Sequence, residues 1–390
     1  MIELSPAVRA VEPYPFEELD RRRAAALAEG RSVVDFGVGD PREETPAFIR
    51  DALAAAITPV SSYPRAAGLP ELRDAIAGWV RRRFEVGLDP ATQILPTLGS
   101  KELVFSLARA VLDPVSGRDL VLTTAPGYPV PERGARYAGG SVLRLPLTEA
   151  NHFLPDLDAV EPAAWDRAAV LWVNYPNNPT GATAPLSFYA EAAERCRAHG
   201  VLLASDEAYT ELWFEDGPPA SALQVGDLTN VLALNTLSKR SSMTGYRSGF
   251  AAGDATLIAA LRGLRPSAGV TPQEFVQRAS VAAWNDETHV ERARGAYAAK
   301  RQVFLEVFAR RAIHVAGSRA GLYLWVGVPG GRGSAAFAYD LLDRTGIIVA
   351  PGSFFGPEGE GYVRMAMVPP LADCERAAGP LEDVLAEATA

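Results

Sequence analysis

The sequence predicts an α/β protein: a large domain with a mostly parallel sheet covered by helices, followed by a smaller α+β domain. Up to about residue 285, short and continuously apolar runs alternate with helical stretches. This alternation is typical of a parallel sheet that is buried on both faces. After that point, shorter strands mix with helices. We therefore expect a large domain at 46–285 and a small domain at 286–390. Residues 1–45 are expected to form an N-terminal arm and part of the small domain.

Apolar β-type runs define four strands of the expected large sheet. They are "LVLTT" at 120–124, "AVLWVN" at 169–174, "GVLLAS" at 200–205 and "VLAL" at 231–234. A helical stretch at 184–199 separates the second run from the third. One long helical register, rich in Ala, Glu and Arg, runs from 273 to 311. In the small domain we expect strands at 321–328 and 361–368, with a helix at 335–346 between them.

Composition limits the class of protein. A chain of 390 residues, 48% of them hydrophobic, can bury a large core. Its net charge of −9, without any basic block, argues against nucleic acid as a partner. Its two cysteines, Cys196 and Cys374, suggest reduced thiols and lack metal-ligand spacing. No signal core or membrane-spanning run is visible. We therefore expect a soluble cytoplasmic protein without a metal site.

Polar segments follow three of the expected strands. "NYPNNPTG" (174–181), "SDEAY" (205–209) and "NTLSKRSSMTGYRSGF" (235–250) each come after an apolar run. In such a sheet, ligands bind beyond the carboxyl ends of the strands. Taken alone, each polar residue is better explained by an ordinary structural role, since an aspartate after a strand is usually a helix cap. Four of them at neighbouring strand ends indicate a functional site: Asn178, Asp206, Tyr209 and Lys239.

Lys239 stands out because the chain has only three lysines, Lys101, Lys239 and Lys300, while its other Lys-or-Arg positions are all arginine. Arginine stays protonated in proteins, whereas a buried lysine can lose its proton and act as a nucleophile. The sequence therefore predicts a chemical role for Lys239. Lys300, on the expected long helix, is predicted to lie on the surface.

Short motifs along nearly the whole chain resemble those of pyridoxal-phosphate-dependent aminotransferases of fold type I, the large group that includes the aspartate aminotransferases. Besides the three strand-end segments, they are "DFGVGDP" (35–41), "YPRAAGLPELR" (63–73), "LGSKE" (98–102), "APGYP" (125–129) and "YVRMAMV" (362–368). The resemblance implies a seven-stranded, mostly parallel sheet and a pyridoxal 5′-phosphate cofactor. It also implies amino acid and 2-oxo acid substrates, and a homodimer with shared active sites.

The resemblance assigns roles around the cofactor ring. Lys239 is expected to hold the cofactor as a Schiff base and then to carry the proton between Cα and C4′. Asp206 is the anion expected beside the ring nitrogen. Asn178 and Tyr209 match donors to the phenolate oxygen, and Tyr128 matches the aromatic residue that stacks on the ring.

Further residues match the groups that bind the cofactor phosphate. Arg247, eight residues after the lysine, fits a bidentate phosphate arginine. Thr236 and Ser238 supply hydroxyls, although the family usually has serine at the first of these places. The N–H groups of Ser100 and Lys101, at the start of a helix, are expected to point at the phosphate.

Substrate-binding residues follow from the same resemblance. Arg364 matches the arginine that forks onto the substrate α-carboxylate, with Gly39 and Asn178 close to that group. The pair Asn178–Pro179 resembles a cis-proline turn. Tyr63 matches a tyrosine that reaches the phosphate of the neighbouring subunit. For the far end of the substrate the candidates are Lys101, Arg65 and Arg265, the last in a loop-like stretch.

Several activities share this framework. A regulatory domain that binds the cofactor without turnover would need an N-terminal DNA-binding module, for which the chain has no room before "VGDP". A carbon–sulfur lyase, a cyclopropane synthase or a decarboxylase would keep the same core residues. The segments "PYPFEEL" (13–19), "GSKELVF" (99–105), "AAWNDETHV" (282–290) and the lysine segment are most similar to N-succinyldiaminopimelate aminotransferases of lysine biosynthesis. Aspartate, aromatic and alanine aminotransferases remain alternatives.

Overall fold

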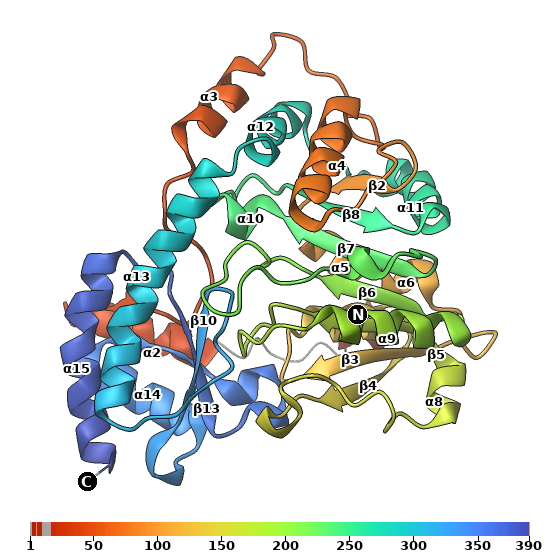
Figure 1. Ribbon diagram of the computed structural model, residues 1–390. Helices are drawn as coiled ribbons and strands as arrows, with labels where there is room; N and C mark the ends of the chain where they lie inside the picture. The colour runs from red at the N-terminus through yellow and green to blue at the C-terminus, as the bar shows by residue number, and fades with distance from the viewer. Residues whose placement is uncertain (1, 5, 10–16, 390) are drawn as a thin grey trace.

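The computed structural model describes residues 2–4, 6–9 and 17–389 (Figure 1). Part of the predicted N-terminal arm and the first residues of the "PYPFEEL" motif lie outside the described residues. The described chain forms one large sheet with helices on both sides, next to a group of short strands and further helices (Figure 1). The predicted α/β class with a smaller α+β part is therefore confirmed.

The large sheet has seven strands in the order β2-β8-β7-β6-β5-β3-β4. Strand β8 alone runs opposite to the other six strands, so the sheet is mostly parallel, as the resemblance implied. The strands are β2 (Ile94–Thr97), β3 (Leu120–Ala125), β4 (Ser141–Pro146), β5 (Ala168–Asn174), β6 (Leu202–Asp206), β7 (Val231–Thr236) and β8 (Gly249–Gly253). All four strands predicted from apolar runs are present.

Helices cover both faces of this sheet. The helices before and between its strands are α1 (Pro6–Arg9), α2 (Glu17–Ala28), α3 (Ala47–Ala55), α4 (Pro70–Phe84), α5 (Lys101–Ser106), α6 (Ala108–Val111), α7 (Val130–Tyr137), α8 (Pro162–Arg167), α9 (Leu186–Ala198) and α10 (Leu237–Arg240). Those after it are α11 (Ala255–Ala268), α12 (Glu274–Trp284), α13 (Thr288–Arg310), α14 (Ser334–Thr345) and α15 (Leu371–Thr389).

The central strands are apolar on both faces because each face meets a different set of helices. In β5, Val170 and Trp172 pack in the core under α5, α7 and α11. The alternating residues Leu171 and Val173 pack in the core under α8 and α9. Alternate side chains of a strand point to opposite faces, so burial of both faces requires an unbroken apolar run.

A second, four-stranded sheet forms the smaller part, in the order β12-β13-β10-β9. A separate parallel pair joins β1 near the N-terminus to β11. These strands are β1 (Val34–Asp35), β9 (Val315–Ala316), β10 (Tyr323–Gly327), β11 (Ile347–Ile348), β12 (Ala350–Pro351) and β13 (Tyr362–Ala366). Helices α13 and α15 pack against each other, and α14 packs on α2 and α15. The domain limits at 45 and 285 stay a prediction.

The prediction of one long helical register from 273 to 311 was wrong. Two helices occupy the segment: α12 ends at Trp284 and α13 begins at Thr288. Asp286 lies in the break, just before the N-cap residue Glu287, and accepts a hydrogen bond over 3.0 Å from the His289 N–H, a backbone donor in the first turn of α13. Aspartate competes for backbone donors in this way and favours helix starts.

The prediction that Lys300 lies on the surface was also wrong. Its side chain is only 3% exposed and forms an ion pair with Glu43. Lys300 lies on the same face of α13 as Tyr297 and Phe304, which are three residues before it and four after it and are both buried. These positions share one side of a helix, so the lysine turns inward with them.

Three further findings concern membrane spans, metal sites and cysteines. No helix among the described residues is long and apolar enough to cross a membrane. Within the same residues, no group of three or more His, Cys, Asp or Glu side chains is arranged to hold a metal ion. Cys196 and Cys374 are both buried free thiols.

Candidate active site

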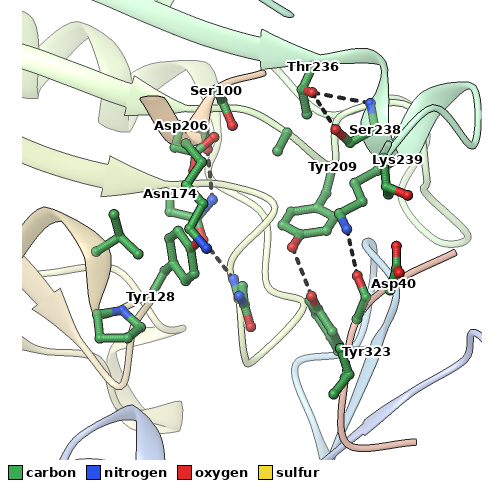
Figure 2. A pocket seen from close by; sticks show the side chains of 18 of the residues that line it. Asp40, Ser100, Tyr128, Asn174, Asp206, Tyr209, Thr236, Ser238, Lys239 and Tyr323 are labelled. Carbon is green, nitrogen blue, oxygen red and sulfur yellow. Dashed lines mark hydrogen bonds between the residues drawn. The ribbon is translucent and has the colours of Figure 1, made fainter. Parts of the chain in front are cut away.

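A cavity of about 510 Å³ lies at the carboxyl ends of β5, β6 and β7 (Figure 2). Asn174, Asp206 and Thr236, the last residues of these strands, contribute to its wall. The predicted site residues in the wall are Gly39, Ser100, Lys101, Tyr128, Asn178, Asp206, Tyr209, Thr236, Ser238, Lys239, Arg247 and Arg364. The structure thus brings together residues that are up to 325 positions apart, the separation of Gly39 from Arg364 (364 − 39).

Lys239 lies on the single-turn helix α10, directly after β7. Its Nζ donates a hydrogen bond to the Gly39 carbonyl oxygen over 2.5 Å (Figure 2). Burial, opposed by the charge of Asp40 and assisted by the nearby cations Arg364 and Arg247, lowers the pKa of the Lys239 amine to about 8. The amine can therefore become neutral close to physiological pH, which a nucleophilic lysine needs.

Titration of this amine can be measured directly. We expect the acylation rate of Lys239 in the cofactor-free chain to rise about tenfold per pH unit and to level off above pH 8, where the neutral amine dominates. Peptide mass spectrometry resolves the reaction because the chain has only three lysines. Exposed Lys101 serves as the internal reference. Levelling off only near the ordinary value of 10.5 would contradict the burial argument.

Asp206 lies at the end of β6, and one of its carboxylate oxygens has no hydrogen-bond partner among the described residues. Asn174 Nδ2 donates to the Asp206 backbone carbonyl over 2.8 Å (Figure 2). The side chain is buried, and its Oδ1 has no hydrogen-bond partner among the described residues. Burial raises the pKa of the carboxyl to about 7, opposed by hydrogen bonds from the Ala208 N–H and the Ser100 hydroxyl. An unpaired buried carboxylate oxygen in a cavity wall is suited to a cationic N–H group.

Arg364 crosses from the smaller part of the molecule into the cavity. Its Nη1 donates to Asn178 Oδ1 over 2.8 Å, and its Nη2 donates to the Gly37 carbonyl over 2.6 Å. The guanidinium also lies over the rings of Tyr323 and Phe355, 4.3 and 4.6 Å from their centroids. These contacts explain how a strand of apolar residues accommodates a charge, and they leave a planar fork in the wall for a carboxylate.

Tyr209 and Tyr323 form a hydroxyl pair beside Lys239, with 2.8 Å between their oxygens (Figure 2). Burial raises the pKa of Tyr209 well above its ordinary value, so its hydroxyl keeps the proton and can donate it. Gly39 lies against the same pair: a Cβ there would come within 2.2 Å of the Tyr323 hydroxyl. Glycine at this position therefore allows the backbone to approach the cavity closely.

Hydroxyl and guanidinium groups form another part of the wall. Thr236 Oγ1 accepts a hydrogen bond from the Ser238 N–H over 3.1 Å and lies 2.9 Å from the Ser238 hydroxyl (Figure 2). Arg247 donates to two backbone carbonyls, over 2.8 and 3.1 Å, which fix its guanidinium. A Cβ at Gly99 would lie 2.7 Å from this guanidinium, so the turn before Ser100 packs on it. Such a combination of donors and positive charge binds phosphate.

The Asn178–Pro179 peptide bond is cis, as the resemblance implied. Three other residues predicted near a site do not lie in the cavity wall. Arg265 was predicted in a loop-like stretch, but it lies inside α11, is 4% exposed and pairs with Glu102 over 3.1 Å. It is absent from the cavity wall, as is Arg65. Tyr63 is fully exposed on this chain and also outside the wall, so its role at a neighbouring site stays a prediction.

Several wall residues were not anticipated from the sequence. Asp40, Arg133 and Tyr323 all contribute to the cavity. Tyr323 begins a strand of alternating aromatic and aliphatic residues, so the sequence predicted only a core position and no role for its hydroxyl. Arg133 lies in α7, five residues after Tyr128. An arginine on a helix, outside any motif, is expected to be a solvated surface residue. Asp40 belongs to "VGDP", a motif in which the resemblance assigned a role only to Gly39.

The chain is similar to known proteins over nearly its whole length. The family model for aminotransferase class I and II matches residues 31–381. The chain belongs to the class I and II aminotransferases. An LL-diaminopimelate aminotransferase of Nitratidesulfovibrio vulgaris is 38% identical over 94% of this chain and 95% of that protein. A Neisseria meningitidis aminotransferase structure is 35% identical, with a TM-score of 0.90 and coverage of 99% and 100%. A probable N-succinyldiaminopimelate aminotransferase from Thermus thermophilus is 33% identical, with a TM-score of 0.87 and coverage of 95% and 100%.

As a member of this family, the aminotransferase depends on pyridoxal phosphate and acts on amino acids and 2-oxo acids. The cavity fits the cofactor chemically. The unpaired Oδ1 of Asp206 is suited to a protonated ring nitrogen, and the Lys239 amine to an aldehyde. The hydroxyls of Thr236 and Ser238, with the Arg247 guanidinium, suit the phosphate.

Proposed function

We propose that this aminotransferase moves an amino group from glutamate to N-succinyl-2-amino-6-oxopimelate, a 2-oxo acid of the diaminopimelate type. The observation that carries the proposal is a pair of cations in the cavity wall, Lys101 and Arg133, without an ion-pair partner among the described residues. This acceptor has three carboxylates and no ammonium group, so both cations attract its far end. Similar proteins named for diaminopimelate or its N-succinyl form support the same substrate class.

In the proposed reaction, the cavity residues have separate tasks. When bound, pyridoxal phosphate supplies an aldehyde that condenses with amines and a ring that takes up electrons from the substrate Cα. Asp206 keeps a proton on the ring nitrogen, and Arg364 binds the substrate α-carboxylate through its fork. Lys239 takes the proton from the substrate Cα and later returns one. Its pKa of about 8 suits this exchange near neutral pH.

The second candidate activity is transamination of LL-diaminopimelate itself, without a succinyl group. Its support is an LL-diaminopimelate aminotransferase that is 38% identical over 94% of the chain. The far end of this amino acid carries an ammonium beside its carboxylate. Lys101 and Arg133 attract the carboxylate but repel the ammonium, so these two cations favour the succinylated substrate.

We expect kcat/KM with N-succinyl-2-amino-6-oxopimelate to exceed that with oxaloacetate by about tenfold or more at fixed glutamate, because a site with cations at its far end discriminates against acceptors that cannot reach them. Glutamate should likewise be preferred to alanine as donor. In the reverse direction, 2-oxoglutarate is the acceptor, and kcat/KM is measured with N-succinyl-LL-diaminopimelate and with LL-diaminopimelate as amino donors. The preferred donor separates the two candidate activities.

The variant Arg133→Gln sharpens this test. It should lower kcat/KM for the succinylated acceptor and leave oxaloacetate turnover nearly unchanged, because only the longer acceptor is expected to reach Arg133. If oxaloacetate were preferred tenfold by the parent enzyme, the diaminopimelate assignment would be wrong and only the general aminotransferase activity would stand.

We further propose that the enzyme is a homodimer in which Tyr63 of each chain completes the phosphate site of its partner. Its full exposure on one chain is compatible with such a contact. Mixing inactive Lys239→Ala and Tyr63→Ala subunits should then restore up to about a quarter of the parent activity, since a hybrid dimer contains one site with both native residues. Formation of hybrids is checked with two affinity tags. Hybrids without recovered activity, or active monomers, would contradict the shared site.

A further inference from the structure

Two segments that the catalytic assignment leaves unexplained meet close to Lys239. Ser241, two residues after the lysine, has its Oγ 2.8 Å from His289 Nε2. The other ring nitrogen, Nδ1, lies 2.7 Å from Asp286 Oδ1. Ser241 is 2% and His289 7% exposed. We call this chain of hydrogen bonds the Asp286–His289–Ser241 relay. It connects the end of α10 with the start of α13.

The protonation of the relay follows from its acceptors. An ionised Asp286 carboxylate can only accept, so the proton of neutral His289 resides on Nδ1 and Nε2 accepts from the Ser241 hydroxyl. Burial lowers the pKa of His289 in spite of its bond to Asp286. The other charged groups around it are Arg240 from α10, Glu287 and Arg292 from the start of α13, and Glu43 and Glu44 from the segment before α3. Each hydrogen bond of the relay thus has one fixed direction.

The residues on either side of Ser241 are held to the same region. Arg240 Nη1 donates to the Ala283 carbonyl over 2.7 Å, and its Nη2 donates to Glu287 Oε2 over 2.7 Å. The Ser242 carbonyl accepts from Thr45 Oγ1 over 2.6 Å. The three residues that follow Lys239 are therefore all anchored outside α10. A helix of one turn has little rigidity of its own, so these anchors help to fix the position of its C-terminal end.

Helix α13 also holds the acceptor of the Lys239 hydrogen bond. Glu43, four residues after Gly39, accepts a hydrogen bond from the Tyr297 hydroxyl over 2.6 Å and pairs with Lys300. Both Tyr297 and Lys300 belong to α13. The amine donor and its carbonyl acceptor, Lys239 and Gly39, are thus both tied to one helix, the donor through the relay and the acceptor through Glu43.

We propose that the Asp286–His289–Ser241 relay positions Lys239 for proton transfer by fixing the end of α10 against α13. Ser241 and His289 are positioning residues in this assignment, since neither lies in the wall of the cofactor cavity. Without the relay, α10 gains freedom, and the amine leaves the Gly39 carbonyl for more hydrated positions. Burial is the main reason for the low pKa of Lys239, so hydration returns that pKa towards its ordinary value.

The test compares three serine variants of the full-length chain. Ser241→Ala removes the relay donor, and Ser241→Thr keeps a hydroxyl. Ser280→Ala is the matched control, because Ser280 is a buried serine of α12 whose hydroxyl bonds to Val276 and Ser248 and not to α13. The acylation midpoint of Lys239 in the cofactor-free chain should rise by about one pH unit in Ser241→Ala, because the amine becomes more hydrated. It should stay near the parent value in Ser241→Thr and Ser280→Ala.

Turnover of the cofactor-loaded enzyme provides the second measurement. In Ser241→Ala, kcat should fall about tenfold while KM changes less than about twofold, the pattern of an interaction needed in the chemical step. If Ser241→Ala does not fold, His289→Asn replaces it, since the shorter amide can still reach Asp286 but not Ser241. The lysine titration needs no substrate, so it is independent of the proposed acceptor.

Two results would overturn the proposal. The first is an equal loss of Tm in Ser241→Ala and Ser280→Ala with no change in the Lys239 midpoint or in kcat, which would make the relay ordinary packing. The second is a fall in kcat with an unchanged Lys239 midpoint, which would mean that the relay acts on another group.

Discussion

Replacement of Lys239 by arginine is expected to abolish transamination and leave the fold intact. Arginine keeps the positive charge and can still donate to the Gly39 carbonyl, which the lysine Nζ contacts over 2.5 Å. It cannot offer a neutral amine, because its guanidinium stays protonated. We expect turnover with glutamate to fall by about 10⁴-fold or more, since the proposed nucleophile and proton carrier are both lost. Turnover, circular dichroism and Tm are measured on the same preparation.

The matched control is Lys300→Arg. Lys300 is also a buried lysine, but its contact is an ion pair with Glu43, and arginine preserves such a pair. The larger side chain costs about 1–3 kcal/mol of stability if the core cannot adjust, yet activity should persist. Comparable losses of turnover in both variants would point to a general packing defect. Near-parental turnover of Lys239→Arg alone would refute the proposed chemistry.

In the large sheet, the strands that the sequence revealed are those with an unbroken apolar run. Strands such as β5 bury both faces, and burial of both faces requires that pattern. Strand β8, "GFAAG" at 249–253, was not predicted because glycine and alanine carry little strand signal. The break between α12 and α13 was missed since Ala and Glu favour helix on both sides of it. There, the capping contact of Asp286 outweighs the helical propensity of its neighbours.

The site could be predicted where several polar residues follow neighbouring strands, because the topology of a parallel sheet brings those ends together. Lys239 and Asp206 were found in this way before any resemblance was used. Arg133 was missed and Arg265 misplaced for the opposite reason. Both are arginines on helices, and only the packing shows that the first faces the cavity while the second is neutralised by Glu102. The role of Tyr63 depends on a second chain, so one chain cannot decide it.

Replacement of Asp206 by asparagine should lower turnover by about 10²–10⁴-fold, because a neutral amide cannot hold a proton on the cofactor ring nitrogen as a carboxylate does. The fold should survive, since the bond from Asn174 goes to the backbone carbonyl of residue 206 and not to its side chain. Cofactor should still bind, because the groups suited to the phosphate are unchanged. The measurement is kcat with glutamate, together with the pH titration of the absorbance of the loaded enzyme, which should shift.

The control for lost charge is Asp40→Asn. It makes the same change in the same cavity wall, but Asp40 acts on Lys239, whose pKa it raises. In this variant the Lys239 pKa should fall further, while the ring nitrogen keeps its partner and turnover drops far less than in Asp206→Asn. Equal losses in both variants would show that total negative charge matters and not the position of Asp206.

The Asp206→Asn variant should be less active than the parent but, without cofactor, more stable. In the cofactor-free chain, burial raises the pKa of Asp206 from 3.8 to about 7, so above pH 4 folding must protonate the carboxylate or bury its charge, and either costs stability. Asparagine carries no such cost. The Tm of cofactor-free Asp206→Asn should therefore match the parent near pH 4 and exceed it increasingly up to about pH 7, where the carboxyl of the folded parent begins to ionise and the difference levels off. A Tm below that of the parent across this range would mean that Asp206 stabilises the empty site, and its unpaired oxygen would need another explanation.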